Sequence, residues 1–221
     1  MDTIIKGVYL REDKHRFICN VSVNGKEEKC YVPASCKLEK LISLVGETVL
    51  LTPIKKDGSE LRYSLFAVKK RRGWVLLNLA RANAVIGENL YKRRFVYLGY
   101  RKDIIYERKI GHYKADLFLP KEQTIIEIKT VLTEEAEGIF PGMPSKRAKE
   151  QLKNISVLLD CGYKACLIIV ALNPKTKRIV IADYLKESLK EVIDKGMLCK
   201  GYSIRFKDLN PTIGDEVEII Y

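Results

Sequence analysis

The sequence lacks the features that would mark a membrane, secreted or zinc-binding protein. No apolar run approaches the ~20 residues that cross a bilayer, and the start of the chain, MDTIIKGVYLRED, has no basic segment followed by an apolar one, as a signal peptide has. The six cysteines form no CxxC pair, so we expect reduced thiols, a cytoplasmic location and no membrane partner. Only two histidines are present, which argues against a zinc site and against histidine-centred acid–base catalysis.

Positive charge and apolar residues are abundant. The 221 residues include 40 lysines and arginines against 28 acidic residues, a formal net charge of +12. A surplus of this size attracts polyanions, with nucleic acid ahead of an acidic membrane. A basic protein without such a partner is the alternative. At 47% hydrophobic residues, the chain can bury a core and is long enough for two small domains.

The first 80 residues have the pattern of short strands. Phe17–Val23 and Lys26–Val32 alternate apolar and polar residues, and Asn24-Gly25 between them predicts a hairpin turn. Residues 34–45 have helical spacing. We therefore predict an OB-fold-like barrel that binds nucleic acid, although other small barrels would give a similar pattern. The remaining predicted strands are Thr48–Pro53, Arg62–Val68 and Trp74–Leu79.

Residues 81–221 change to longer elements. The continuous apolar run Ala165–Leu172 predicts a buried central strand. The pattern as a whole predicts an α+β or α/β domain, with a mixed sheet flanked by helices and a boundary near residue 80. The predicted helices are Ala80–Leu90, Ser145–Cys161 (capped by Ser145) and Asp183–Lys195, and the other predicted strands are Glu107–Pro120, Thr124–Val131, Arg178–Ala182 and a last one at Gly201–Phe206.

The segment YKADLFLPKEQTIIEIK, residues 113–129, predicts a hairpin with a four-residue loop. If the hairpin is symmetric about this loop, Asp116 faces Glu127. Because strand side chains alternate between faces, Asp116, Glu127 and Lys129 share one face. The apolar residues on the opposite face are Ala115, Leu117, Ile126 and Ile128.

Two acids directly opposite each other destabilise a hairpin unless something neutralises them. A divalent cation bound to both carboxylates would do so, and hard oxygen ligands suit Mg²⁺ or Mn²⁺. Such an ion can stabilise the charge that develops on a scissile phosphate. The alternative is an exposed charged face with an ion pair between Asp116 and Lys129.

The sequence around this hairpin resembles the sugar fermentation stimulation protein (SfsA) family. That family carries EVKSVTL followed by FPDAPTxRGxxHL, and residues 127–152 read EIKTVLTEEAEGIFPGMPSKRAKEQL. Upstream, the chain resembles the family's E…SRxDF stretch and its HxPNTGxMxxLL motif. The matching positions are Pro33, the Asn of Ala82-Asn83, Glu107, Asp116, Phe140-Pro141, Pro144 and Arg147.

The resemblance implies an N-terminal OB-fold and a C-terminal PD-(D/E)xK nuclease-like domain, a DNA-binding protein tied to sugar-utilisation genes, and nuclease activity. By matching position, Asp116 and Glu127 become metal ligands and Lys129 the catalytic lysine. Glu107 becomes an additional acidic ligand or a structural residue. The departures leave open weakened, altered or lost cleavage; they are Ala34-Ser35-Cys36, Tyr113-Lys114, Gly142, Ala148 and Gln151.

Several cations are candidates for nucleic-acid binding. Lys146 and Lys149 share a face of the predicted helix with Arg147 beside them, and the helix N-terminus favours a phosphate. In the barrel, four consecutive cations precede Trp74, which either stacks on a base or packs in the core. A solvated surface is the alternative for each group. The candidates are Arg16, Lys37, Lys70, Arg71, Arg72, Lys114, Lys146, Arg147 and Lys149.

We therefore predict a metal-dependent nuclease that hydrolyses phosphodiester bonds in DNA, with RNA as an alternative substrate. A non-catalytic DNA-binding regulator on a nuclease-derived scaffold is the second hypothesis, and an RNA-binding module dominated by the barrel is the third. A homodimer is left open, since no exposed apolar seam argues for one.

Overall fold

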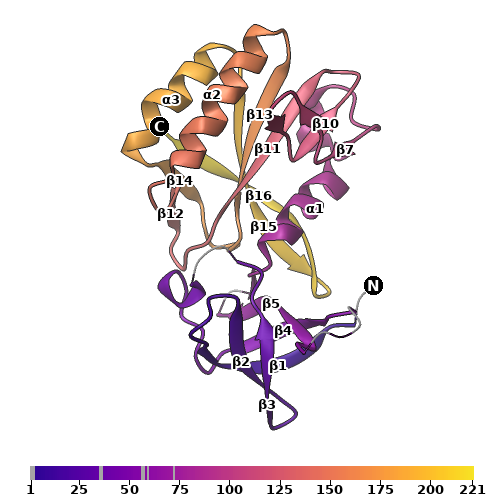
Figure 1. The fold of residues 1–221 in the computed structure, drawn as a ribbon, viewed down its shortest axis with the longest axis vertical. Helices are drawn as coiled ribbons and strands as arrows, with labels where there is room; N and C mark the ends of the chain where they lie inside the picture. The colour runs from indigo at the N-terminus through magenta and orange to yellow at the C-terminus, as the bar shows by residue number, and fades with distance from the viewer. Residues whose placement is uncertain (1–2, 35–36, 56–57, 59, 72) are drawn as a thin grey trace.

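The computed structural model describes residues 3–34, 37–55, 58, 60–71 and 73–221. It consists of an all-β barrel and a larger part in which helices cover a mixed sheet (Figure 1). Within the described residues, every helix is too short or too polar to cross a membrane.

The first part is a five-stranded barrel with the strand order of an OB-fold. Antiparallel pairings run in the order β3-β2-β1-β4-β5, and a parallel pairing of β3 with β5 closes the ring, so that β6 extends from β5 outside it. Asn24 and Gly25 adopt positive φ of 50° and 78°, which confirms the predicted hairpin turn. The elements are β1 (Ile5–Glu12), β2 (Ile18–Val23), β3 (Lys26–Tyr31), the 3-10 helix η1 (Leu38–Lys40), β4 (Thr48–Pro53), β5 (Tyr63–Lys70) and β6 (Gly73–Leu76).

The barrel departs from prediction in three respects. Strand β1 was not predicted, and the predicted strand 74–79 contributes β6, which lies outside the closed ring. The helix predicted for residues 34–45 is only the single turn η1, and residues 35 and 36 lie outside the described chain. After η1, Ile42 and Leu44 are buried while residues 41, 43 and 45 are exposed. The Ile42 N–H donates to the Leu38 carbonyl at 3.0 Å, so the helical spacing of these two residues reflects one turn that does not continue as a helix.

The second part contains an eight-stranded sheet in the order β12-β14-β16-β15-β13-β11-β10-β7. Strands β11, β13 and β15 run parallel, and β10 and β16 are antiparallel to their neighbours β11 and β15. The elements are α1 (Leu79–Asn89), η2 (Arg93–Leu98), β7 (Ile105–Tyr106), β8 (Lys109–Ile110), β9 (Tyr113–Lys114), β10 (Leu117–Leu119), β11 (Thr124–Val131), β12 (Glu137–Phe140), α2 (Lys146–Asp160), β13 (Lys164–Ala171), β14 (Arg178–Ile181), α3 (Asp183–Asp194), β15 (Leu198–Lys207) and β16 (Asn210–Ile220).

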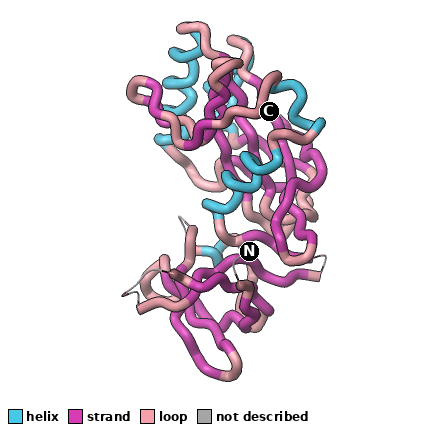
Figure 2. The backbone as a smooth tube through the Cα atoms, turned by 90° about the vertical axis from the view of Figure 1, so that its right-hand side faces the viewer, coloured by secondary structure: helices cyan, strands magenta, loops and turns pink. Residues whose placement is uncertain are grey.

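The sheet is buried on both faces. Helices α2 and α3 pack on one face, and α1 with η2 packs on the other. The core on the α1 side continues into the barrel, because Phe66 and Leu76 belong to it. The Phe66 and Phe206 rings meet edge to face at 6.1 Å, and the Leu76 N–H donates to the Leu172 carbonyl at 3.2 Å. Figure 2 shows the barrel directly below the sheet at this junction.

The second half also departs from prediction. Residues 107–120 form three short strands rather than one, since the chain bends at Asp116 between β9 and β10. Strands β7, β12 and β16 and the 3-10 helix η2 were not predicted. The three helices and the central strand β13 agree with prediction to within one or two residues at most ends.

Candidate active site

The register of the β10–β11 hairpin is the predicted one. Leu119 pairs with Thr124 and Leu117 with Ile126, which sets Asp116, one residue before β10, opposite Glu127. The Asp116 carboxylate replaces a backbone acceptor where the β10–β11 ladder is interrupted, because its Oδ2 accepts the Ile128 N–H at 2.7 Å. Its Oδ1 accepts the side-chain amide of Asn83, from α1, at 3.2 Å. Strand β11 and helix α1 therefore fix the position of this carboxylate.

The predicted position of Ala115 is wrong. Leu117, Ile126 and Ile128 pack in the core on the α1 side, whereas Ala115 packs in the core on the α2 side. The bend at Asp116 interrupts the strand, so alternation counted through it reverses the face.

Glu127 is a buried carboxylate in the middle of β11, with a relative exposure of 3%. Its Oε1 accepts hydrogen bonds from Lys129 Nζ at 2.5 Å and from Gln151 Nε2, in α2, at 2.8 Å. Its Oε2 accepts the Tyr113 hydroxyl proton. Sequence reasoning noted Tyr113 and Gln151 only as departures from a motif and Asn83 only as a match. Their contacts with the carboxylates depend on the packing of β9, α1 and α2 onto β11.

The Asp116 and Glu127 carboxylates repel each other when both are ionised. Burial and the charge of Glu127 raise the pKa of Asp116 to about 6, against the opposing effects of the Ile128 N–H, Lys129 and Asn83. Burial and Glu127 also raise the pKa of the Tyr113 hydroxyl, which therefore stays a donor. Because one ammonium faces two carboxylates, the site retains an unneutralised negative charge.

This arrangement fits a divalent cation that takes oxygen ligands. Within the described chain, no cluster of three His, Cys, Asp or Glu residues could hold a metal ion, so Asp116 and Glu127 would be the only carboxylate ligands. Magnesium commonly binds through one or two carboxylates and completes its shell with water and substrate phosphate. The donor set therefore suits a divalent cation that keeps several waters better than an ion that needs an all-protein cage.

The carboxylate of Glu107, the predicted additional ligand, points to solvent rather than to Asp116 and Glu127. The Glu107 carboxylate is 73% exposed and pairs with Lys114 Nζ at 2.9 Å. Its backbone N–H donates to the Asp116 carbonyl at 2.9 Å, so the residue borders the site through its backbone. Lys114, a predicted nucleic-acid contact, is exposed beside the same bend.

The first turns of α2 place the predicted cations next to the site. Ser145 caps the helix as predicted, because its hydroxyl accepts the Ala148 N–H at 3.2 Å. Lys146, Arg147 and Lys149 are exposed, and Lys149 Nζ lies 5.8 Å from the Tyr184 ring centroid. Arg147 lies one turn before Gln151, which contacts Glu127, so this face of α2 leads to the carboxylate pair.

The predicted cations of the barrel are scattered. Arg16 lies over the Phe17 ring at 4.5 Å, and Lys37 pairs with Glu12 at 3.7 Å. Arg71 is exposed and lines a cavity of about 360 Å³ at the junction with the sheet. Arg72 lies outside the described residues. Trp74 is partly buried against the shared core, as the core interpretation predicts, with Lys69 Nζ 5.3 Å from its ring.

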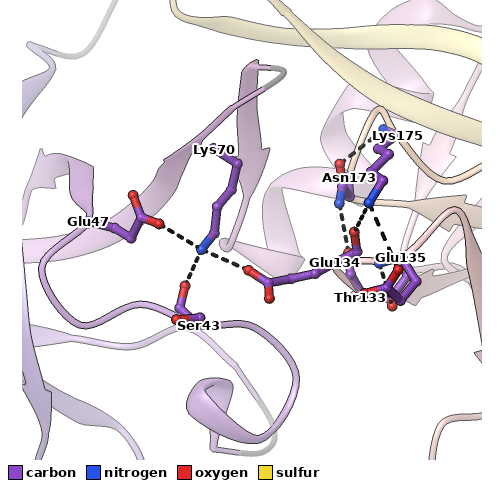
Figure 3. A network of polar contacts seen from close by, with 8 residues as sticks. All are labelled: Ser43, Glu47, Lys70, Thr133, Glu134, Glu135, Asn173 and Lys175. Carbon is purple, nitrogen blue, oxygen red and sulfur yellow. Dashed lines mark hydrogen bonds and ion pairs between the residues drawn. The ribbon is translucent and has the colours of Figure 1, made fainter.

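Lys70 joins the barrel to the sheet (Figure 3). Its ammonium donates to the Ser43 carbonyl, to Glu47 at 3.0 Å, and to Glu134 at 2.7 Å in the β11–β12 loop. Burial alone would lower the pKa of Lys70, but the bonds to Glu134 and Glu47 raise it above its ordinary value. The side chain is only 18% exposed, so its charge is used within the molecule rather than presented to a ligand.

The rest of this network holds the β11–β12 loop against the sheet. The Asn173 side chain donates to the Thr133 carbonyl at 2.8 Å, and Lys175 Nζ donates to the Glu134 carbonyl at 3.1 Å (Figure 3). The loop follows Lys129 by only a few residues. Lys70 therefore links the barrel to the strand that carries the candidate site.

Fold and site together define a class of two-domain protein, in which an OB barrel precedes a mixed α/β domain that carries a carboxylate pair and a lysine. Residues 13–77 match the family model described as the SfsA N-terminal OB domain, and residues 80–210 match the sugar fermentation stimulation protein RE domain. The chain therefore belongs to the SfsA family, the sugar fermentation stimulation proteins.

Relatives match along most of the chain. A sugar fermentation stimulation protein homologue of Pseudoalteromonas atlantica is 24% identical over 99% of this chain and 98% of its own. One from Desulfitobacterium hafniense is 29% identical over 71% of this chain and 68% of its own. The structure of Pyrococcus furiosus SfsA, solved in complex with Ca²⁺, superposes with a TM-score of 0.80 at 18% identity and covers 100% of this chain and 98% of the other.

Proposed function

We propose that this protein is a divalent-metal-dependent nuclease that hydrolyses phosphodiester bonds of DNA, with RNA as an alternative substrate. The observation that carries the proposal is the pair Asp116 and Glu127, held opposite each other beside Lys129 with one negative charge unneutralised. A net charge of +12 on the chain favours a polyanionic substrate.

Each residue of the site has a proposed role. A bound Mg²⁺ or Mn²⁺ supplies positive charge that stabilises the charge developing on the phosphate. Asp116, oriented by Asn83 and the Ile128 N–H, and Glu127, oriented by Gln151, hold that ion. Lys129 contributes an ammonium beside the reacting phosphate. Glu107 supports the bend through its backbone.

The surrounding surfaces position the substrate. In this proposal residues 1–80, the barrel, hold a strand, and residues 81–221 cut it. Lys146, Arg147 and Lys149 at the start of α2 bind phosphates, with Lys114 across the bend. The Pyrococcus furiosus relative, solved with Ca²⁺, supports a divalent ion as the cofactor, since Ca²⁺ takes the same oxygen ligands as Mg²⁺.

Cleavage of labelled single-stranded DNA, duplex DNA and RNA in Mg²⁺ or Mn²⁺ tests the proposal. We expect Asp116→Asn and Glu127→Gln each to reduce the cleavage rate by at least about 100-fold, because each removes a charged ligand. The exposed acid Asp103 provides a matched control, and Asp103→Asn should cut like the wild type. Wild-type rates in either site variant would overturn the assignment.

A second function, binding without cleavage, is favoured by one observation. The oxygens of Glu127 already accept hydrogen bonds from Tyr113, Lys129 and Gln151, which satisfies a buried carboxylate without an ion. Thermal unfolding with and without 10 mM Mn²⁺ (an assay condition of about 100 Kd for a 0.1 mM site) separates the two functions. A nuclease site predicts a rise in the unfolding temperature that Asp116→Asn abolishes. Metal-independent oligonucleotide binding with no rise would favour the binding protein.

A further inference from the structure

A basic and aromatic segment beside the candidate site has no role in the proposal above. Residues 91–102 read YKRRFVYLGYRK and join α1 to β7 through η2. Phe95 and Leu98 are buried and anchor the segment on the sheet. Tyr91, by contrast, is 73% exposed, which is too open for a core residue. Between residues 91 and 109, seven lysines and arginines face two acids.

This segment encloses a cleft large enough for a nucleobase. The cleft has a volume of about 470 Å³, and Tyr91, Tyr100, Arg101 and Lys102 line it. Arg101 is held rigidly, because its Nε donates to the Leu90 carbonyl at 2.8 Å. Lys102 is exposed and forms no ion pair with any carboxylate of the described chain. The lining therefore combines aromatic surface with a free positive charge.

The acidic groups near the cleft do not cancel this charge. Glu122 accepts the Tyr100 N–H at 3.0 Å and pairs with Lys164 at 3.0 Å, so its charge is compensated. Lys121 Nζ lies 4.0 Å from the Tyr100 ring centroid and adds a further cation. Asp103 is exposed to solvent.

Helix α1 connects the cleft to the carboxylate pair. Asn83 binds Asp116, and Gly87, one turn later on the same face of α1, lines the cleft. Tyr106 packs over Gly87 so closely that a methyl group there would lie 2.3 Å from the Tyr106 hydroxyl oxygen. The four residues from Asn83 to Gly87 rise about 6 Å along the helix, roughly two base steps of about 3.4 Å each. A strand with a phosphate at the pair would therefore reach the cleft within a few nucleotides.

We propose that this cleft binds one unstacked nucleobase of the strand whose phosphate lies at Asp116 and Glu127, with stacking on Tyr91 and phosphate contact from Lys102. The inference rests on the proposed function and adds that the bound strand is single-stranded at this position. Aromatic stacking of this kind tolerates every base, because each base has a π-face.

A cycle that combines a protein variant with an abasic oligonucleotide tests the proposal. The probe is a set of fluorescein-labelled 12-nucleotide DNA strands, each lacking one base at a different position, and Kd is measured by anisotropy with Ca²⁺ in place of Mg²⁺. We expect one abasic position to weaken binding to the wild type about tenfold. Tyr91→Ala should bind the intact strand about tenfold more weakly and lose all sensitivity to that position.

Two controls accompany the cycle. Tyr91→Phe keeps the stacking face and should bind like the wild type. Tyr221→Ala removes a tyrosine that is 52% exposed, at the end of β16 and far from β7 in the sheet order, and should leave Kd and the abasic profile unchanged. Because the Tyr91 ring is largely in solvent, the unfolding temperature of Tyr91→Ala should equal that of the wild type.

The outcomes separate the cleft from the nuclease. Coupling between Tyr91 and one abasic position supports the cleft even if no strand is cut, in which case only the proposed activity fails. Cleavage by the wild type with identical abasic profiles for wild type and Tyr91→Ala overturns the cleft and leaves the nuclease standing. Absence of binding to every strand overturns the cleft as well.

Discussion

Asp116 is a residue at which the proposed function opposes stability. Burial and the charge of Glu127 raise its pKa from 3.8 to about 6, so the folded state binds this proton more tightly than the unfolded state. The stability gained from the proton is fully present below pH 3.8. It is lost as the pH rises through about 6, and above that the ionised carboxylate destabilises the fold.

We therefore compare the free energy of unfolding of Asp116→Asn with that of the wild type at two pH values. The difference, variant minus wild type, should be more positive at pH 7 than at pH 4 by about 1–3 kcal/mol. Urea unfolding of both proteins at the two pH values measures this difference. Asp103→Asn, at an exposed acid, should change stability by less than about 0.5 kcal/mol at both. An equal effect of Asp116→Asn at pH 4 and pH 7 would mean that burial and the charge of Glu127 do not raise the pKa of Asp116 in the fold.

Tyr113 competes with a cation for Glu127. Its hydroxyl donates to Oε2, and hydrogen bonds to charged groups contribute about 1.5–3 kcal/mol. Tyr113→Phe should therefore lower the stability of the metal-free protein but tighten Mn²⁺ binding about tenfold. Calorimetric titration with Mn²⁺ measures the affinity, and Tyr31→Phe on the barrel is the control. Weaker binding in Tyr113→Phe would instead make the hydroxyl part of the ion site.

At the scale of elements, the sequence predicts those whose pattern is long and uninterrupted. Helices α1, α2 and α3, strand β13 and the β10–β11 register follow from periodicity and turn residues, which act locally. The opposition of Asp116 and Glu127 follows from that register. The residues that complete the site do not, because Asn83 and Gln151 reach the carboxylates from separate helices.

The failures occur where tertiary contacts decide the conformation. Leu38 and Ile42 have helical spacing, but the barrel interior buries them from a single turn that does not continue as a helix. Ala115 lies before the bend at Asp116, and counting alternate faces along a continuous strand does not reveal that bend. Lys70 resembles a nucleic-acid contact in sequence, but Glu47, 23 residues earlier, and Glu134, 64 residues later, pair with its ammonium in the fold. Such contacts leave no local signal.

The N-terminus of α2 depends on one side chain. Ser145 accepts the Ala148 N–H, and loss of such a cap costs about 1 kcal/mol. Ser145→Ala should lower the free energy of unfolding by that amount, and Ser145→Asp, which keeps an acceptor, should not. Urea denaturation monitored by circular dichroism at 222 nm compares the three proteins. Equal stability of Ser145→Ala and wild type would show that the first turn of α2, which carries Arg147, is held by other contacts.

At the scale of the whole molecule, barrel and sheet share one core. Phe66 and Leu76 from the barrel pack with residues of α1, β13 and β15, and Lys70 adds a polar link at the edge. Because neither part can lose this contact without exposing apolar surface, we expect them to unfold together. The arrangement also gives barrel and candidate site a fixed relation, which a strand bound to both would require.

Two spectroscopic probes can test this coupling, because one reports the junction between barrel and sheet and the other reports the helices of the second part. The single tryptophan, Trp74, lies in β6, and all α-helices of the described chain follow residue 78. Tryptophan fluorescence and circular dichroism at 222 nm should give the same urea midpoint in the wild type. Phe66→Ala should lower both midpoints, with a loss of about 3 kcal/mol in the free energy of unfolding. Lys70→Ala should do the same with a loss of about 1 kcal/mol, whereas the exposed Lys29→Ala should shift neither midpoint. Separate midpoints in the wild type would mean that the parts fold independently, and the barrel could then move relative to the carboxylate pair.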